Sequence, residues 1–227
     1  MIFKQVFDKK SSTFTYLIAS SEGREALIID PVIENVDNYI QLLNELDLKL
    51  VKVIDTHIHA DHVTGASKLK DKTKCITIMG DHTPADSVEI KVKDGELIKL
   101  DQLELRAIYT PGHTSDSFSF LMNNYLFSGD TLLINGTGRT DFQNGNAKDA
   151  YDSIFNKLLK LPDETLLYPA HDYKGENVST IGKEKKLNPR LQVENVDQYI
   201  EIMNDLNLQK PVSLDFNISS NLKLGAI

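Results

Sequence analysis

Three histidines and an aspartate fall within six consecutive positions, from His57 to His62, and this cluster constrains the fold of the chain more than any other stretch. It reads His-Ile-His-Ala-Asp-His and directly follows the apolar run 50–54, which is typical of a buried strand. Imidazole nitrogens and carboxylate oxygens at such density are costly to bury unless a cation compensates them. The cluster therefore predicts a metal site at a strand end and leaves open which metal it holds and how many ions.

Other predicted strands end in residues of the same kind. His113, Asp130 and His171 each follow a separate strand-like run. Five of the six histidines thus lie at predicted strand ends, and only His82 lies in a plain loop. An isolated histidine is most simply a satisfied core or capping residue, but strand ends on one edge of a layered α/β fold are where ligands gather. We therefore expect these residues to form one site.

Apolar periodicity divides the chain into strand-like and helix-like segments. Strands are expected at 1–7, 13–19, 25–30, 50–54, 75–79, 88–92, 97–100, 103–109, 117–122, 124–128 and 165–168, and helices at 34–46, 60–69, 147–159 and 196–206. Residues 211–227 are expected to be an irregular tail. Strand runs interleaved with helices predict an α/β protein whose sheets are covered by helices, and 227 residues suit one domain.

Composition narrows the possible partners and compartment. A net charge of −8 argues against nucleic acid, because a phosphate backbone would be repelled. The single cysteine, Cys75, allows no disulfide within the chain, and its strand-like surroundings favour a buried, inert thiol. Residues 1–8 are expected to form a strand and not a secretory or transit segment, and no apolar run reaches the length that spans a bilayer. The expected protein is cytoplasmic and does not contact a membrane.

Four motifs resemble, in order, those of the metallo-β-lactamase superfamily. They are His-Ile-His-Ala-Asp-His at 57–62, Gly-His-Thr at 112–114, Ser-Gly-Asp at 128–130 and Pro-Ala-His at 169–171. The resemblance implies an αββα sandwich, with two mixed sheets flanked by helices and a metal site along one edge. In hydrolases of that superfamily one zinc is held by the positions of His57, His59 and His113. A second ion is held by those of Asp61, His62 and His171, with Asp130 bridging the two.

A finer resemblance, from about Phe3 into the tail, is to the persulfide dioxygenases, also called sulfur dioxygenases. Its motifs are Gly-Arg-Thr-Asp-Phe-Gln at 138–143, Pro-Ala-His-Asp-Tyr at 169–173, Val-Ser-Thr-Ile at 178–181 and Leu-Asn-Pro-Arg-Leu at 187–191. It implies one Fe(II) per chain, with His57, His113 and Asp130 as metal-binding and catalytic residues. His59, Asp61, His62 and His171 would lie in the outer shell or at a second-metal position.

The same resemblance implies a single domain over 1–227, in which 175–227 is a short extension contributing to the substrate site, and a homodimer. The implied reaction converts glutathione persulfide, O₂ and water to glutathione and sulfite. A two-His, one-carboxylate face leaves adjacent iron positions open for O₂ and sulfur. Zinc has no redox chemistry and could be present only as an alternative or adventitious metal for this reaction. The thiol that carries the persulfide stays open.

Glutathione carries carboxylates, so cations and hydroxyl donors are expected at the mouth of the site. Arg139, Tyr173 and Arg190 fall on family motifs, and Thr114 follows the iron ligand His113. We expect these four residues to bind substrate. Two have a simpler interpretation: Arg139 could instead form a salt bridge with the neighbouring Asp141 that shapes its loop, and Arg190 could be a solvated charge at a helix end.

One departure from the family pattern concerns thiols. Many members have a cysteine between the loop glycines where this chain has Thr137, and the human-type tail carries a further cysteine that residues 219–227 lack. Redox sensitivity attached to those thiols is therefore absent here, while the expected iron ligands are all present.

Two alternatives compete with the dioxygenase interpretation. A glyoxalase II-type hydroxyacylglutathione hydrolase would use the same histidines and aspartates around a two-metal centre of zinc or iron. Against it stand the loop at 138–143 and the 56 residues after His171, which are few for the helical substrate domain of such enzymes. A non-catalytic metal-binding or redox-sensing protein is disfavoured by the complete ligand set.

Overall fold

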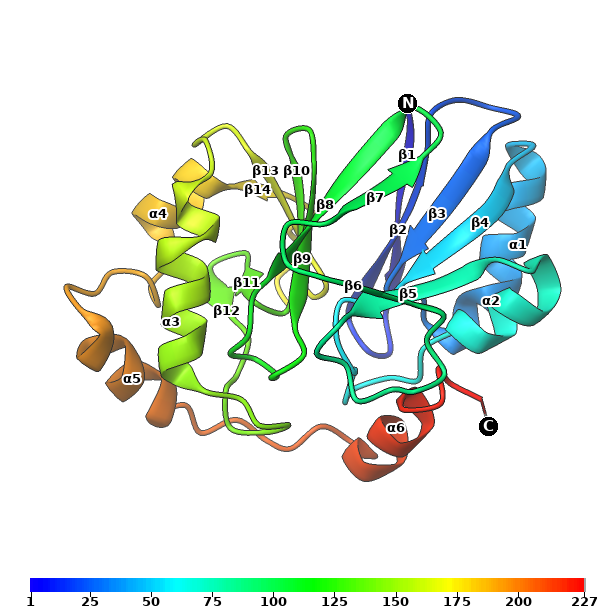
Figure 1. The fold of residues 1–227 in the computed structure, drawn as a ribbon. Coiled ribbons are helices and arrows are strands. Elements are labelled where there is room, and N and C mark those ends of the chain that lie inside the picture. The colour runs from blue at the N-terminus through cyan, green and yellow to red at the C-terminus, as the bar shows by residue number, and fades with distance from the viewer. Residues whose placement is uncertain (227) are drawn as a thin grey trace.

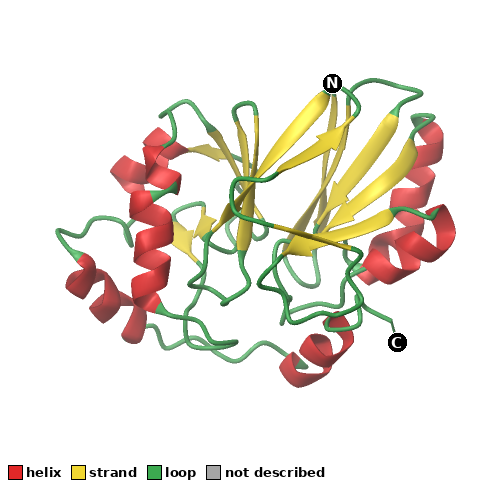
Figure 2. Cartoon of the chain, in the orientation of Figure 1, coloured by secondary structure: helices red, strands yellow, loops and turns green. Residues whose placement is uncertain are grey.

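Two six-stranded sheets lie face to face in the computed structural model, which describes residues 1–226 (Figures 1 and 2). The first sheet has the order β1 (Ile2–Asp8), β2 (Thr13–Ala19), β3 (Glu25–Ile29), β4 (Lys49–Ile54), β5 (Ile76–Gly80) and β6 (Ile90–Val92). The second has the order β14 (Ser179–Thr180), β13 (Leu166–Pro169), β10 (Tyr125–Gly129), β9 (Phe118–Met122), β8 (Leu103–Tyr109) and β7 (Leu97–Leu100). A small hairpin joins β11 (Leu132–Leu133) to β12 (Gly136–Thr137).

Both sheets are mixed. In the first, β3 to β6 run parallel while β1 to β3 pair antiparallel. In the second, only β10 and β13 pair in parallel. Helices cover the two outer faces, so the expected αββα sandwich is confirmed.

The covering helices divide into two groups (Figure 1). On the first sheet lie α1 (Val36–Glu45) and α2 (Ala66–Thr73), and on the second lie α3 (Ala147–Asn156), α4 (Ile181–Leu187) and α5 (Val196–Asn204). Short 3-10 turns occur at Ile33–Asn35 and Leu158–Lys160. The last helix, α6 (Leu214–Asn221), belongs to neither group and lies at the end of the sandwich below β5 and β6.

An aromatic-rich core fills the space between the sheets. From the first sheet Phe14 and Tyr16 enter it, and from the second Phe118, Phe120 and Phe127, all buried. Burying each such side chain contributes about 1.5–3 kcal/mol. Strands β2 and β3 are buried on both faces. One set of their alternating residues points into this core, and the other set points to the layer under α1 and α2. This two-sided burial explains why these strands are near-continuous apolar runs.

Each outer layer is closed by an amphipathic helix. On α1, Val36, Tyr39 and Leu43 recur at helical spacing and pack on the first sheet. On α3, Ala150 and Ile154 do the same against the second sheet. The helices expected at 34–46, 147–159 and 196–206 are therefore confirmed as elements, with ends shifted by a few residues.

Two expectations about secondary structure were wrong. The segment 60–69 was expected to be helical, but residues 55–65 form an irregular loop and α2 begins only at Ala66. The tail was expected to be irregular, but it contains α6, and α4 was not anticipated at all. None of the helices within residues 1–226 is long and apolar enough to cross a membrane.

Candidate metal centre

Four strands deliver the ligand-type residues to one edge of the sandwich. His57 follows β4, His113 follows β8, Asp130 follows β10 and His171 follows β13. Backbone hydrogen bonds join the two sheets at this edge, from the Phe118 amide to the Thr56 carbonyl at 2.9 Å and from the Phe14 amide to the Ala170 carbonyl at 2.7 Å. These bonds fix the positions of the two sheets relative to each other at this edge.

Gly129 allows the closest approach at this edge. It has φ +53° at the end of β10, and a Cβ built there would lie 2.7 Å from the Thr56 hydroxyl oxygen. A larger residue would be strained and would push Asp130 away from the loop that carries His57. The glycine thus sets the distance between ligands contributed by the two sheets.

His57, His113 and Asp130 converge on one point. Each offers a ligand atom, and these atoms all lie within 4.8 Å of one another. The Nε2 of His113 lies 3.4 Å from Asp130 Oδ2, and the rings of His57 and His113 are nearly perpendicular, with centroids 4.9 Å apart. Asp130 Oδ1 is buried and has no hydrogen-bond partner among the described residues. A buried carboxylate oxygen left unpartnered beside two imidazoles fits a metal ion.

Hydrogen bonds fix the tautomers of both histidines. The Thr56 hydroxyl donates to Asp30 Oδ2 at 3.0 Å, so it accepts from His57 Nδ1, which lies 2.9 Å away. His113 Nδ1 donates to the Arg139 carbonyl at 2.7 Å. In each ring the proton sits on Nδ1 and the Nε2 lone pair stays free, which is the arrangement a metal ligand needs. Burial holds the pKa of His57 well below its ordinary value, so this imidazole is neutral.

The remaining cluster residues, His59, Asp61, His62 and His171, lie beside this triad. Asp61 Oδ2 is 2.9 Å from His62 Nδ1 and 3.5 Å from His171 Nε2. His59 Nδ1 and His62 Nε2 are buried without a hydrogen-bond partner in the described part of the chain. Together His59, Asp61 and His62 form a second group of ligand atoms within 4.8 Å, so the donor set also fits a second ion.

The acidic and basic groups of that cluster shift one another's pKa values. Burial alone would raise the pKa of Asp61, but His62 and His171 hold it well below the ordinary value of an aspartate. Burial would lower the pKa of His171, but Asp130 and Asp61 raise it to about 9. Asp61 therefore carries a negative charge at neutral pH.

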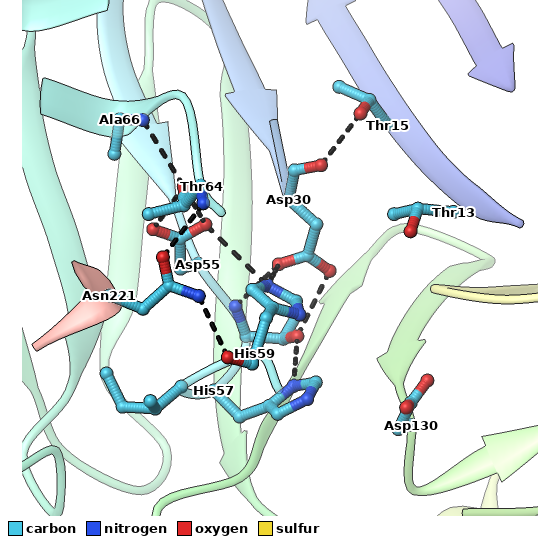
Figure 3. Close-up of polar contacts among 12 residues, drawn as sticks. Thr13, Thr15, Asp30, Asp55, His57, His59, Thr64, Ala66, Asp130 and Asn221 are labelled. Atoms are coloured by element: carbon cyan, nitrogen blue, oxygen red, sulfur yellow. Dashed lines mark hydrogen bonds and ion pairs between the residues drawn. The ribbon is translucent and has the colours of Figure 1, made fainter. Parts of the chain in front are cut away.

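Asp30 is a site residue that the sequence pattern did not single out. It is fully buried at the end of β3, where it accepts from the Thr56 amide at 2.7 Å and contacts His59 Nε2 at 3.1 Å. Figure 3 shows this carboxylate between Thr15 and the two histidines. An aspartate that ends an apolar strand and precedes a proline was the available signal, because a buried acid needs such partners.

Asp116 and Gln143 were also missed. Asp116 Oδ2 accepts from the Ile58 amide at 3.0 Å, and Gln143 Nε2 donates to the Ile58 carbonyl at 2.6 Å. Both backbone groups of the residue after His57 are thus held by side chains. No sequence pattern pointed to either contact.

A cavity of about 620 Å³ opens over the metal-binding edge. Its lining includes Asp61, His113, Asp130 and His171, three of the four expected substrate residues (Arg139, Tyr173 and Arg190), and the segment Leu208–Val212 in part. Tyr173 is exposed at the mouth and stacks on the His171 ring, with centroids 5.9 Å apart. Arg190 is half-buried and donates to the backbone carbonyl and hydroxyl of Thr137.

Two of the expected substrate residues have other contacts. Thr114 is completely buried, its hydroxyl donates to Asp116 at 2.7 Å, and it does not line the cavity. The structure gives Thr114 a contact away from the cavity, and a role in substrate binding stays a prediction. Arg139 makes a two-point salt bridge to Asp141 and donates to the carbonyls of Leu208 and Gln209. The simpler interpretation of Arg139 as a loop-shaping residue accounts for these contacts.

A model of the metallo-beta-lactamase superfamily matches residues 9–86 and 80–171. The chain belongs to this superfamily. Persulfide dioxygenase ETHE1 from Homo sapiens, a mitochondrial protein, is 41% identical over 228 residues, which cover 99% of this chain and 89% of that protein. The crystal structure of ETHE1 from Myxococcus xanthus superposes with a TM-score of 0.97 at 46% identity, covering 99% of this chain and all of that one.

Hydroxyacylglutathione hydrolases match at lower identity and over less of the chain. Hydroxyacylglutathione hydrolase from Dictyostelium discoideum is 32% identical over 175 residues, which cover 73% of this chain and 64% of that protein. The chain therefore groups with the persulfide dioxygenases, in agreement with the family expected from the motifs.

Proposed function

We propose that the chain is a persulfide dioxygenase that oxidises the sulfane sulfur of a low-molecular-weight thiol persulfide, with glutathione persulfide as the preferred substrate. In the balanced reaction the persulfide RSSH, O₂ and H₂O give the thiol RSH and sulfurous acid, which ionises to sulfite. The observation that carries the proposal is the match to persulfide dioxygenases over 99% of the chain. Fold alone would not assign the reaction, since one superfamily hosts many activities.

The proposed cofactor is one Fe(II) per chain, held by His57, His113 and Asp130. Iron on a two-His, one-carboxylate face supplies redox chemistry and open positions for O₂ and sulfur. The chain's own groups orient the ligands: the Thr56 hydroxyl and the Arg139 carbonyl accept hydrogen bonds from the Nδ1 atoms of His57 and His113. Their Nε2 atoms consequently face the metal position without competing hydrogen bonds.

Arg190 is the proposed anchor for a substrate carboxylate. Its half-buried guanidinium lines the cavity and, within residues 1–226, bonds Thr137 and no carboxylate. Burial lowers the pKa of this group, but an arginine stays charged, so an anion in the cavity would gain from pairing with it. Tyr173, at the mouth, is the proposed hydroxyl donor.

The segment 175–227 is proposed to complete the substrate site. Arg190 and the cavity-lining residues Leu208, Gln209, Pro211 and Val212 all come from it. The apolar members of this wall would cover the substrate and exclude water from the side opposite the metal-binding edge.

The second candidate function is a hydroxyacylglutathione hydrolase with two metal ions. It is favoured by the second ligand group of His59, Asp61 and His62 and by the partial match to such hydrolases. The same cavity of about 620 Å³ would serve either reaction, so the two functions are separated by their chemistry.

An oxygen-electrode assay with two substrates separates the two functions. Anaerobically purified protein is given glutathione persulfide and S-lactoylglutathione in parallel, and O₂ uptake, sulfite release and thioester hydrolysis are recorded. We expect O₂ uptake and sulfite with the persulfide alone. Rapid thioester hydrolysis without O₂ uptake would replace the dioxygenase by the hydrolase.

The homodimer and the cytoplasmic location stay predictions. Light scattering coupled to size exclusion tests the first, with twice the chain mass of 25.5 kDa as the expected result. Fractionation of the source cells tests the second.

A further inference from the structure

Residues 55–65, the loop between β4 and α2, carry His57, His59 and His62 but form neither helix nor extended strand. Backbone groups in such a loop need partners from elsewhere if they are buried. Much of this loop is buried, and side chains distant in sequence supply those partners. The C-terminal helix α6 supplies the largest share of them in the second half of the loop.

Asn221, the last residue of α6, bonds three backbone groups of the loop. Its Nδ2 donates to the His59 carbonyl and to the His62 carbonyl, each at 2.8 Å. Its Oδ1 accepts from the Thr64 amide at 2.9 Å. Figure 3 shows the side chain reaching from α6 to His59 and Thr64. A single buried amide thus fixes the peptide planes of two histidines of the cluster.

Asn217 extends the contact by one helical turn. It lies on the same face of α6 as Asn221, four residues earlier, and its Nδ2 donates to the Ala60 carbonyl at 2.9 Å. Both asparagines are buried, with 6% and 2% of their surface exposed. Consecutive carbonyls of the loop, those of His59 and Ala60, are therefore held by consecutive turns of one helix.

The helix is itself held against the sandwich. Leu224, just beyond α6, packs in the core layer under α1 and α2, and its carbonyl accepts from the Ser67 amide at 2.9 Å. Gly225 has φ +75°, and a Cβ there would lie only 2.0 Å from the Thr64 carbonyl oxygen. The backbone at Leu224 and Gly225 is thus held against α2 and the loop by contacts that do not depend on the Leu224 side chain.

We infer that α6 is a clamp on the histidine loop and that Asn221 is a positioning residue for the metal centre. The inference rests on the proposed function. His59 and His62, whose carbonyls Asn221 holds, each also have one ring nitrogen, Nδ1 and Nε2 respectively, that is buried without a partner in the described chain. Releasing these carbonyls removes the bonds that fix the backbone at both histidines, so their Cα positions, and with them the rings, can shift relative to the site.

The clamp also joins the metal-binding edge to the cavity wall. Asn217 Nδ2 lies 3.4 Å from the carbonyl oxygen of Val212, which lines the cavity. At its other end this wall is tied by Arg139, which donates to the Leu208 and Gln209 carbonyls. The same short segment therefore borders the substrate and positions the ligand loop.

The test is a Co(II) titration of the metal-free full-length chain, which reports the centre without relying on turnover. The visible spectrum of bound Co(II) and its dissociation constant, from competition with a chelator, are compared for wild type and Asn221→Leu. Leucine keeps the branched shape of the asparagine side chain, with larger methyl groups in place of the amide atoms, and removes all three hydrogen bonds. Because Asn221 bonds the loop beside the proposed ligand His57 and not at the ligand itself, we expect the affinity to fall several-fold to roughly tenfold, the lower end of the range for groups that orient metal ligands, and the spectrum to change.

Two variants on the same tail separate positioning from stability. Leu224→Ala removes packing but no side-chain bond to the loop, so it should lower the thermal midpoint while leaving Co(II) affinity and spectrum unchanged. Ser219→Ala, whose exposed hydroxyl bonds only the Phe216 carbonyl, should change neither. If Asn221→Leu fails to fold, Asn217→Ala provides the readout, with a several-fold affinity loss expected.

The outcomes distinguish the clamp from the proposed function. An Asn variant that is less stable than wild type but has the same affinity and spectrum overturns the clamp alone. So does an equal loss of affinity in Leu224→Ala. A wild-type chain that binds no Co(II) overturns the proposed metal centre and the clamp with it.

Discussion

The Nδ1 atom of His113 donates to the backbone carbonyl of Arg139 at 2.7 Å, and this bond depends on the residue between Thr137 and Arg139. That residue is Gly138, where a Cβ would lie 2.0 Å from the Asp130 carbonyl oxygen and 2.9 Å from His113 Nδ1. A glycine therefore lets the Arg139 loop pass directly over two of the three proposed ligands.

The first prediction follows from this packing. Gly138→Ala should displace His113 or Asp130, because their backbone and ring atoms cannot yield without moving a ligand, and metal affinity should fall by roughly 10–100-fold. Metal content after anaerobic purification measures the effect. Gly136→Ala is the matched control, since a Cβ there meets nothing closer than 4.0 Å. Equal metal content in the two variants would contradict the argument.

The second prediction concerns Asp130. Wild-type protein purified without oxygen should hold about one iron per chain, as a single facial site requires. Asp130→Ala should retain almost none and lose activity, since it removes the carboxylate whose Oδ1 is buried and unpartnered within residues 1–226. Elemental analysis gives the stoichiometry. Asp163→Ala, an exposed aspartate paired with Lys185, serves as the control and should keep its iron. An iron-loaded Asp130→Ala protein would remove this residue from the ligand set.

Much of the sandwich and the place of the site could be predicted from local sequence patterns. Strands such as β2 and β3 are determined by runs of apolar and β-branched residues, and the ligand-type residues stand directly after strands. Because strand ends on one edge meet in space, His113 and Asp130 could be grouped with the histidine cluster before their positions were known.

The parts that sequence patterns missed depend on contacts between distant residues. The stretch 60–69 has helical periodicity, yet its first half is a loop because Asn217 and Asn221 bond the backbone groups of Ala60, His62 and Thr64. Asn221 and His59 are 162 positions apart, so no local pattern links them. The environment of Thr114 was missed for a different reason: its partner Asp116 is only two residues away, but both are buried by tertiary packing.

The third prediction tests the proposed substrate anchor. Arg190→Ala should raise the KM for glutathione persulfide roughly tenfold or more with a smaller change in kcat, because a charge-assisted hydrogen bond contributes about 1.5–3 kcal/mol. Steady-state kinetics by O₂ uptake separates the two constants. Lys186→Ala, an exposed cation on the neighbouring helix, is the control and should leave both unchanged. An unchanged KM in Arg190→Ala would remove this residue from the substrate site.

The fourth prediction is a pH dependence of stability at a contact between the two sheets. Arg24, in the turn before β3, makes a two-point salt bridge to Asp101, in the turn between β7 and β8, and Ser20 also donates to this carboxylate, at 2.5 Å. These bonds lower the pKa of Asp101 from 3.8 to about 2. A lowered carboxyl pKa means that the contact stabilises the fold above about pH 4, and that this contribution is lost as the pH falls through about 2.

Arg24→Ala should therefore be less stable than wild type at pH 7, and the difference in the free energy of unfolding should shrink as the pH falls below 4. Urea unfolding from pH 7 downward measures the difference, and an NMR titration should show the pKa of Asp101 rising toward 3.8 in the variant. The effect at pH 7 should be small, because the pair is on the surface and screened by solvent and salt. Lys10→Ala, which removes an exposed cation paired with Glu34, provides the comparison for a lost surface charge. A difference between wild type and Arg24→Ala that grows toward acid pH would mean that the salt bridge does not link the two turns in solution.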